Sequence, residues 1–167
     1  MKWVESNVHY QGCTFYSVDS SIEDSIFDNC SFRNEASFSN LRGCRFNNCG
    51  FSEGLHLSLS ETNGKIPDYV FGITDLTHLR IVWGDIKILP KEIIRLKNLE
   101  VLDLHLNLLT SIPNEVSHLK KLKILNLSSN AASLFGPYFS EDHKQEIRSW
   151  LPSCEVIFET SIPKTSN

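Results

Sequence analysis

The sequence lacks the features that mark several functional classes. No apolar run approaches the roughly 18 residues that a membrane-spanning helix needs, and the opening MKWVESNVHY lacks the apolar core of a signal peptide. The 16 Lys and Arg are scattered and the net charge is −4, so no basic face marks a nucleic-acid or anionic membrane surface. We therefore expect a cytoplasmic protein that binds neither nucleic acid nor membrane.

Sequence signatures of catalysis and metal binding are also missing. The chain contains no GxSxG, no HExxH, no phosphate-binding glycine loop and no CxxC. Its five cysteines are Cys13, Cys30, Cys44, Cys49 and Cys154. Because their number is odd and a reducing compartment is expected, we interpret them as free thiols packed in a core rather than as disulfides or metal ligands. We expect no enzymatic activity, no cofactor and no metal.

The middle of the chain repeats with a period of 23 residues. Ile-Pro or Leu-Pro dipeptides stand at Ile66-Pro67, Leu89-Pro90 and Ile112-Pro113. A second pattern, LxxLxLxx followed by Asn or Gly, begins at Leu76, Leu99 and Leu122. Apolar residues also recur three and six positions after each proline, at Val70, Ile73, Ile93, Leu96, Val116 and Leu119. A fixed period of this length predicts a solenoid of stacked coils.

These motifs resemble the leucine-rich-repeat consensus LxxLxLxxNxLxxLPxxIxxL over residues 55 to 131. The resemblance implies an α/β solenoid, a right-handed superhelix with a parallel β-sheet on its concave side and irregular or helical turns on its convex side. The alternating leucines point to one face of a short strand. We expect the amides of Asn107 and Asn130 to bind backbone groups of the neighbouring coil, whereas Gly84 interrupts this ladder.

The first third of the chain has a different repeat. A small residue stands two positions before an aromatic one in Cys13-Thr14-Phe15, Ser25-Ile26-Phe27, Cys30-Ser31-Phe32, Ala36-Ser37-Phe38, Cys44-Arg45-Phe46 and Cys49-Gly50-Phe51. The spacing resembles pentapeptide repeats, which form a β-helix. It also fits shortened leucine-rich repeats with cysteine in the asparagine position. Both interpretations stay open, and either predicts β-helix-like coils stacked on the first complete repeat.

Two further segments complete the predicted solenoid. The coil beginning with Leu55-x-Leu57-x-Leu59 joins the halves, one residue short of the regular period. Ser140 followed by two acidic residues predicts a helix start, with Cys154 to Phe158 as a final strand, so the C-terminus forms a helix–strand cap. We predict one solenoid domain over 1–167, divided into N-terminal coils (1–54), leucine-rich repeats (55–136), a cap (137–160) and a loose tail (161–167).

The outward positions of the stacked strands form the candidate site. Equivalent positions lie side by side in three columns: Ser58, Arg80, Asp103 and Asn126; Ser60, Val82, His105 and Ser128; Glu61, Trp83, Leu106 and Ser129. From these we select a partner-binding set of Arg80, Val82, Trp83, Asp103, His105, Leu106, Asn126 and Ser128. Aromatic and apolar anchors rimmed by polar groups are typical of binding hot spots. On the simpler interpretation, Arg80 and Asp103 merely neutralise each other and Trp83 rests on a neighbouring loop.

The pattern as a whole favours a non-enzymatic protein-interaction module that binds a protein partner through its concave face as a monomer or weak homodimer. A narrower hypothesis is an immunity or inhibitor protein that neutralises a toxin or enzyme by direct binding. Two hypotheses of a different kind are a structural element of a larger array and an enzyme or metal protein. The sequence does not identify the partner.

Overall fold

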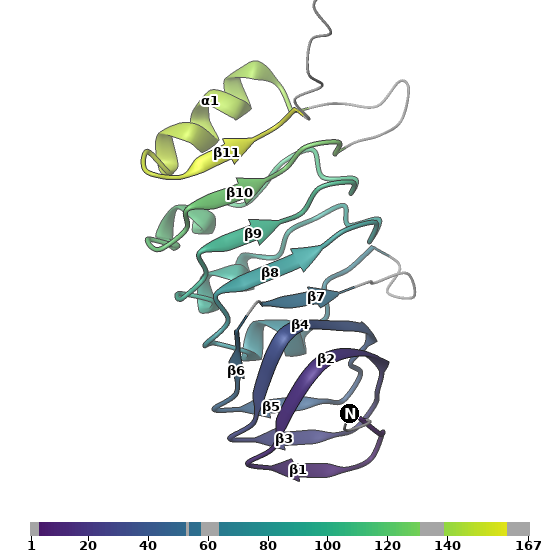
Figure 1. Ribbon diagram of the computed structural model, residues 1–167. Helices are drawn as coiled ribbons and strands as arrows, with labels where there is room; N and C mark the ends of the chain where they lie inside the picture. Colours follow the sequence, from purple (N-terminus) through teal and green to yellow (C-terminus); the bar gives the residue numbers. More distant parts are fainter. Residues whose placement is uncertain (1–3, 53, 58–63, 131–138, 160–167) are drawn as a thin grey trace, which may run out of the picture.

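The computed structural model describes residues 4–52, 54–57, 64–130 and 139–159. Within these ranges the chain winds in successive coils whose strands stack in parallel (Figure 1). One sheet has eight strands in the order β11-β10-β9-β8-β7-β4-β2, with β6 beside β4, and a second has the order β1-β3-β5. The predicted α/β solenoid with a parallel sheet is confirmed, and its right-handed winding stays a prediction.

The elements are short and follow the coil period. The strands are β1 (His9–Gln11), β2 (Thr14–Ser21), β3 (Ile26–Asp28), β4 (Ser31–Asn40), β5 (Arg45–Asn47), β6 (Gly50–Phe51), β7 (Leu55–Leu57), β8 (His78–Ile81), β9 (Val101–Asp103), β10 (Ile124–Asn126) and β11 (Glu155–Ile157). The helical segments are the 3-10 turns η1 (Asp68–Gly72), η2 (Lys91–Arg95) and η3 (Asn114–His118), and the α-helix α1 (Glu141–Trp150).

The regular coils bury their leucines in one continuous core. Leu79, Leu102 and Leu125 are paired across β8, β9 and β10, and all three are buried. Leu104 and Leu127, two residues further on, are buried in the same cluster. This burial follows from the alternation of side chains along a strand, which sends both leucines of each LxL to the inner face.

Each coil returns through a 3-10 turn that begins after a proline. Pro67, Pro90 and Pro113 are extended, with φ between −65° and −73°, and the turns η1, η2 and η3 start at the next residue. Proline suits this position because its ring fixes φ near −65° and its missing N–H is not needed there. The apolar residues three and six positions after the prolines are buried, as the sequence pattern predicted.

The N-terminal coils contribute two strands per turn, one to each sheet. Tyr10, Phe27 and Phe46 stack along the smaller sheet with ring centroids 5.0 and 4.8 Å apart. Their counterparts on the larger sheet are Phe15, Phe32 and Phe51, with centroids 5.1 and 4.7 Å apart. The two ladders meet nearly edge to face, which is a favourable geometry for aromatic pairs.

Cysteines in these coils take the place that asparagine takes in the repeats. The Cys49 thiol donates to the Phe27 carbonyl of the preceding coil at 3.2 Å, as the Asn107 amide donates to the Ile81 carbonyl at 2.8 Å. The position of the Cys49 thiol matches the frame of shortened repeats with cysteine in the asparagine position, and the choice between the two architectures stays a prediction. The strands of that frame, β3 and β5, lie in the smaller sheet, however, and the larger sheet continues through β4 and β2.

The register of the joining coil differs from the prediction. Leu55 pairs with Leu79 and His56 with Arg80, so this coil is one residue longer than the period rather than one shorter. His56, not Ser58, therefore lies beside Arg80. The alternating leucines at 55, 57 and 59 allow two registers that both point apolar residues inward, and the sequence pattern alone does not separate them. Ser58, Ser60 and Glu61 lie outside the described residues.

The C-terminal cap has the predicted helix and strand. The Ser140 hydroxyl accepts a hydrogen bond from the His143 backbone N–H at 3.2 Å at the start of α1, and β11 pairs with β10. Ile147 and Leu151 are buried, which ties the helix to the last coil. No helix in the described ranges is long and apolar enough to cross a bilayer.

Candidate functional site

The outer face of the larger sheet carries a polar column over four strands. His56, Arg80, Asp103 and Asn126 occupy equivalent places on β7, β8, β9 and β10. Neighbouring members are separated by one strand spacing, about 4.8 Å. Three of the four were predicted in this column, and His56 replaces Ser58. The column places charged and amide side chains within reach of one bound segment.

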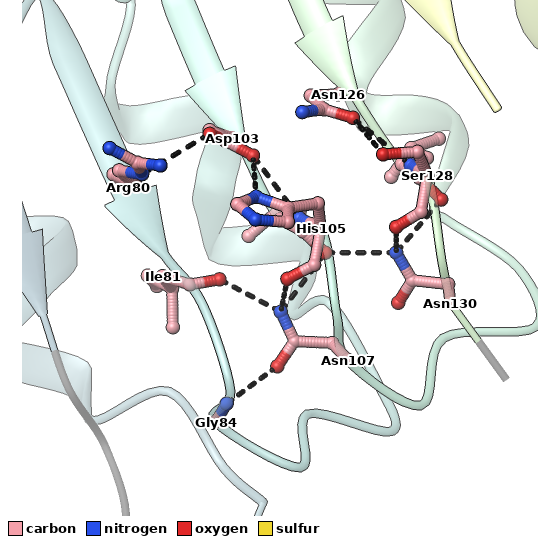
Figure 2. Close-up of polar contacts among 11 residues, drawn as sticks. Arg80, Ile81, Gly84, Asp103, His105, Asn107, Asn126, Ser128 and Asn130 are labelled. Carbon is pink, nitrogen blue, oxygen red and sulfur yellow. Dashed lines mark hydrogen bonds and ion pairs between the residues drawn. The ribbon is translucent and has the colours of Figure 1, made fainter. Parts of the chain in front are cut away.

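Asp103 is the centre of a small polar network (Figure 2). Its Oδ2 lies 3.3 Å from Arg80 Nε. Its Oδ1 lies 2.7 Å from His105 Nδ1 and accepts the His105 backbone N–H at 3.2 Å. Both carboxylate oxygens are therefore occupied, and the side chain is only 17% exposed. The network fixes the positions of Arg80 and His105 relative to the sheet.

The next coil repeats this arrangement without charge. Asn126 Oδ1 accepts from the Ser128 backbone N–H at 3.1 Å and from its hydroxyl at 2.7 Å, in the place where Asp103 binds His105 (Figure 2). In this column the charged part of the site therefore ends at Asp103, because Asn126 and Ile157 occupy the equivalent places on β10 and β11.

Two of the eight predicted contact residues are not accessible. Val82 is 8% exposed and Ser128 is 2% exposed, although the alternation of the pattern predicted both to project outward. They lie where each strand has ended and the chain begins its turn, so the simple two-residue alternation no longer sets their direction. Their neighbour in that column, His105, is half-buried. We assign Val82 and Ser128 to the support of the site.

The third column occupies a turn with unusual backbone geometry. Trp83, Leu106 and Ser129 all have positive φ, at 59°, 56° and 53°. Bulky residues are disfavoured in this left-handed region, where Gly, Asn and Asp are common. Leu106 is half-buried, but Trp83 is 71% exposed. An exposed indole thus stands at the end of β8, three residues beyond Arg80.

Buried amides below the face hold these turns in place. Asn107 Nδ2 donates to the carbonyls of Ile81 and Leu104 at 2.8 and 3.0 Å, and its Oδ1 accepts from the Gly84 N–H at 3.0 Å (Figure 2). Asn130 similarly donates to the Leu104 carbonyl at 2.8 Å. The predicted asparagine ladder is confirmed. At Gly84 a Cβ would lie 3.2 Å from Asn107 Oδ1, so the residue that interrupts the ladder also leaves space for the next amide.

A cavity of about 320 Å³ lies on the sheet face over β7, β8 and β9. Its side-chain lining includes His56, His78, Arg80, Val101 and Asp103. The cavity also borders Gly54, which has φ of +91°. The backbone of Gly54 lies so close to His78 that an added Cβ would be 2.3 Å from His78 Cβ. His56, His78 and Val101 are absent from the predicted set. All three occupy outward positions of the strands, and only the placement of His56 beside Arg80 required the correct register of the joining coil.

The edge of the site carries a screened ion pair. Lys123 Nζ lies 2.6 Å from Glu100 Oε2, and this hydrogen bond and charge hold the pKa of Glu100 below its usual range. The pair is solvent-exposed and contributes little to stability. It does neutralise Glu100, the residue that precedes β9.

Comparison with known proteins supports the repeat pattern. Residues 74–131 match the model of the leucine-rich repeat family. A solved structure of a leucine-rich-repeat protein from Leptospira interrogans is 26% identical, with a TM-score of 0.44 over 74% of this chain and 37% of that one. The chain therefore spans little more than a third of that protein's length. A comparison with curated proteins finds no match.

Proposed function

We propose that this chain, whose residues 74–131 match the model of the leucine-rich repeat family, is a non-enzymatic module that binds another protein through the open face of its larger sheet. Repeat solenoids stack small units into an extended surface whose outward residues vary freely, and they commonly use this surface for binding. The proposal takes the chain as one solenoid domain, monomeric or weakly dimeric, in the cytoplasm.

Trp83 is the observation that carries this proposal. Its side chain is 71% exposed, so it adds little to the core. Its positive φ of 59° costs roughly 1 kcal/mol compared with a residue suited to the left-handed region. Folding alone therefore favours Asn or Gly at this position. A large exposed aromatic residue kept at the expense of stability is what a binding anchor requires.

The groups around Trp83 supply the rest of a contact surface. Leu106 follows it in the turn column, and Arg80, Asp103, His105 and Asn126 provide polar contacts that the intramolecular network holds in place. An apolar anchor beside ordered polar groups is the usual composition of an interaction hot spot. Val82 and Ser128 lie beneath this surface and support it.

The test uses a variant for which binding and stability change in opposite directions. Trp83→Asn removes the anchor and relieves the backbone strain. Its free energy of unfolding is expected to rise by about 1 kcal/mol, while capture of the partner from native cell extract falls at least about tenfold. Urea unfolding and quantitative mass spectrometry of the captured proteins provide the two measurements.

Tyr16→Thr is the matched control, because Tyr16 is another exposed aromatic, 66% accessible, but lies on β2 outside the repeats. This variant should retain the partner. If every protein that binds the wild type also binds Trp83→Asn equally well, Trp83 is not the anchor and the proposed site is wrong.

An immunity or inhibitor role is a narrower form of the same proposal, in which the bound partner is a toxin or enzyme that loses activity. It predicts that co-expression of this chain restores the growth of cells producing the captured partner. Growth rescue by the wild type and by Tyr16→Thr, but not by Trp83→Asn, would support it.

A further inference from the structure

We propose that the cavity over β7, β8 and β9 binds a glutamate carboxylate from an acidic segment of the partner. This inference rests on the proposed function and specifies the chemistry of the partner. The cavity of about 320 Å³ is near the lower limit for small-molecule pockets, a size that suits one side chain and its adjoining backbone.

The argument begins with which hydrogen-bonding groups in the cavity are already occupied. Both oxygens of Asp103 are engaged, one by His105 and the other by Arg80 Nε. Among the described residues, the two terminal nitrogens of Arg80 have no partner, and its side chain is 52% exposed. The acceptor in the cavity is therefore satisfied while the strongest donor is not. A ligand that fits this imbalance presents acceptors.

Two further lining residues suit a carboxylate. His78 lines the cavity, its Nδ1 lies 3.0 Å from Thr77 Oγ1, and its other ring nitrogen is a donor in the tautomer that carries the proton there. Val101 provides a half-buried apolar wall, against which the methylene groups of a glutamate can pack. A guanidinium group binds a carboxylate through two parallel N–H···O bonds, which also orients the ligand.

The charge of the cavity selects a monoanion. Arg80 is balanced by Asp103, and the nearby Glu100 is balanced by Lys123. Among the described residues these two pairs leave no net charge, so a ligand is held by the directed N–H groups of Arg80 rather than by a surplus of positive charge. One carboxylate brings a single charge, whereas a phosphorylated side chain brings nearly two and would face the Asp103 carboxylate without further compensation.

The test measures binding of defined capped peptides to the full chain. The probe is acetyl-Gly-Gly-Glu-Gly-Gly-amide, with the glutamine peptide as its neutral isostere and the phosphoserine peptide as the dianionic competitor. Two-dimensional NMR of the arginine Nε–Hε groups follows Arg80 directly. We expect saturable shifts of the Arg80 signal with the glutamate peptide, and at least about tenfold weaker binding of the glutamine peptide.

Arg80→Gln should weaken binding of the glutamate peptide at least about tenfold, whereas Arg95→Gln, which removes an exposed arginine at the end of η2, should leave it unchanged. Equal shifts at Arg80 and Arg95, equal binding of the glutamate and glutamine peptides, or tighter binding of phosphoserine would each overturn the proposal.

The outcome is distinguishable from failure of the proposed function. Partner capture that depends on Trp83 but not on Arg80 would retain the binding face and reject the carboxylate site. Glutamate binding at Arg80 without any partner that depends on Trp83 would do the reverse.

Discussion

The N-terminal coils and the leucine-rich repeats both stack one coil on the next, but they use different side chains to do so. Both must bury one coil against the next and satisfy the carbonyl groups where the chain turns. The first region uses stacked aromatic rings and buried thiols. The second uses leucines and buried amides. The thiol and the amide bind the same carbonyl position of the preceding coil. The difference lies in the number of hydrogen bonds, because the amide of Asn107 also accepts from backbone N–H groups of that coil.

The turn residues differ between the two regions in an instructive way. Left-handed positions in the N-terminal coils are occupied by residues that tolerate positive φ, such as Gly12, Asn29 and Asn48. The corresponding turns after β8 and β9 contain Trp83 and Leu106. Among the described residues of the first region only Ser17 departs from the Gly, Asn and Asp that suit positive φ, whereas the second region places two bulky side chains there. Such departures are expected where a surface serves binding rather than folding.

The largest effect is expected from breaking the aromatic ladder. Phe32 is fully buried and contacts rings on both sheets, so Phe32→Ala should lower the free energy of unfolding by about 4 kcal/mol. Phe32→Leu keeps most of the volume but loses the ring geometry, and should cost about 2 kcal/mol. Leu102→Met, the control in the repeats, should cost less than about 1 kcal/mol. Urea unfolding with equal losses for Phe32→Leu and Leu102→Met would show that ring stacking adds nothing beyond burial.

A smaller effect is expected when the buried amide of a repeat is replaced by the thiol that the N-terminal coils use. Asn107→Ala leaves buried backbone groups of the preceding coil without partners and should cost about 3 kcal/mol. Asn107→Cys restores one weak donor and should recover about half of that loss. Thermal and urea unfolding measure both variants. Equal destabilisation by alanine and cysteine would mean that the thiols of the N-terminal coils act through packing alone.

The smallest effect concerns the alkaline behaviour of the thiols. Burial raises the pKa of Cys49 from 9.0 to about 11, so the folded state favours the protonated thiol. Its contribution to stability is complete below pH 9.0 and is lost as the pH rises through about 11. The wild type should therefore lose about 2 kcal/mol more than Cys49→Ala over this interval. Urea unfolding at pH 8, 9, 10 and 11 tests this, and parallel curves for the two proteins would contradict it.

The regular part of the fold was predictable because its period is strict. Recurring leucines, prolines and asparagines indicated the strands, irregular or helical return turns and the amide ladder, and the structure shows that the turns are 3-10. The N-terminal coils were harder, since small-x-aromatic triplets fit two architectures. Only pairing between distant strands shows that each coil contributes to two sheets. Local spacing does not contain that information.

Only part of the candidate site was predictable, because the strict period fixes positions within the repeats but not at their ends. The pairing of Arg80 with Asp103 follows from their equivalent places in adjacent repeats. Val82 and Ser128 were misplaced because strand alternation was extended into a turn. His56 was left out of the Arg80 column because three alternating leucines permit two registers. Errors of this kind arise where the repeat begins or a strand ends, and there neighbouring coils decide the geometry.

Each buried asparagine donates a hydrogen bond to a carbonyl of the preceding coil, and this contact allows the number of coils to change. Asn107 and Asn130 bind the carbonyl of the preceding coil in the same way, so any unit of this kind recognises the one before it. Duplication of one 23-residue unit inserts a coil that both neighbours already accept. The outer face of the larger sheet can thus lengthen by one strand at a time, while the aromatic N-terminal coils and the terminal helix remain unchanged.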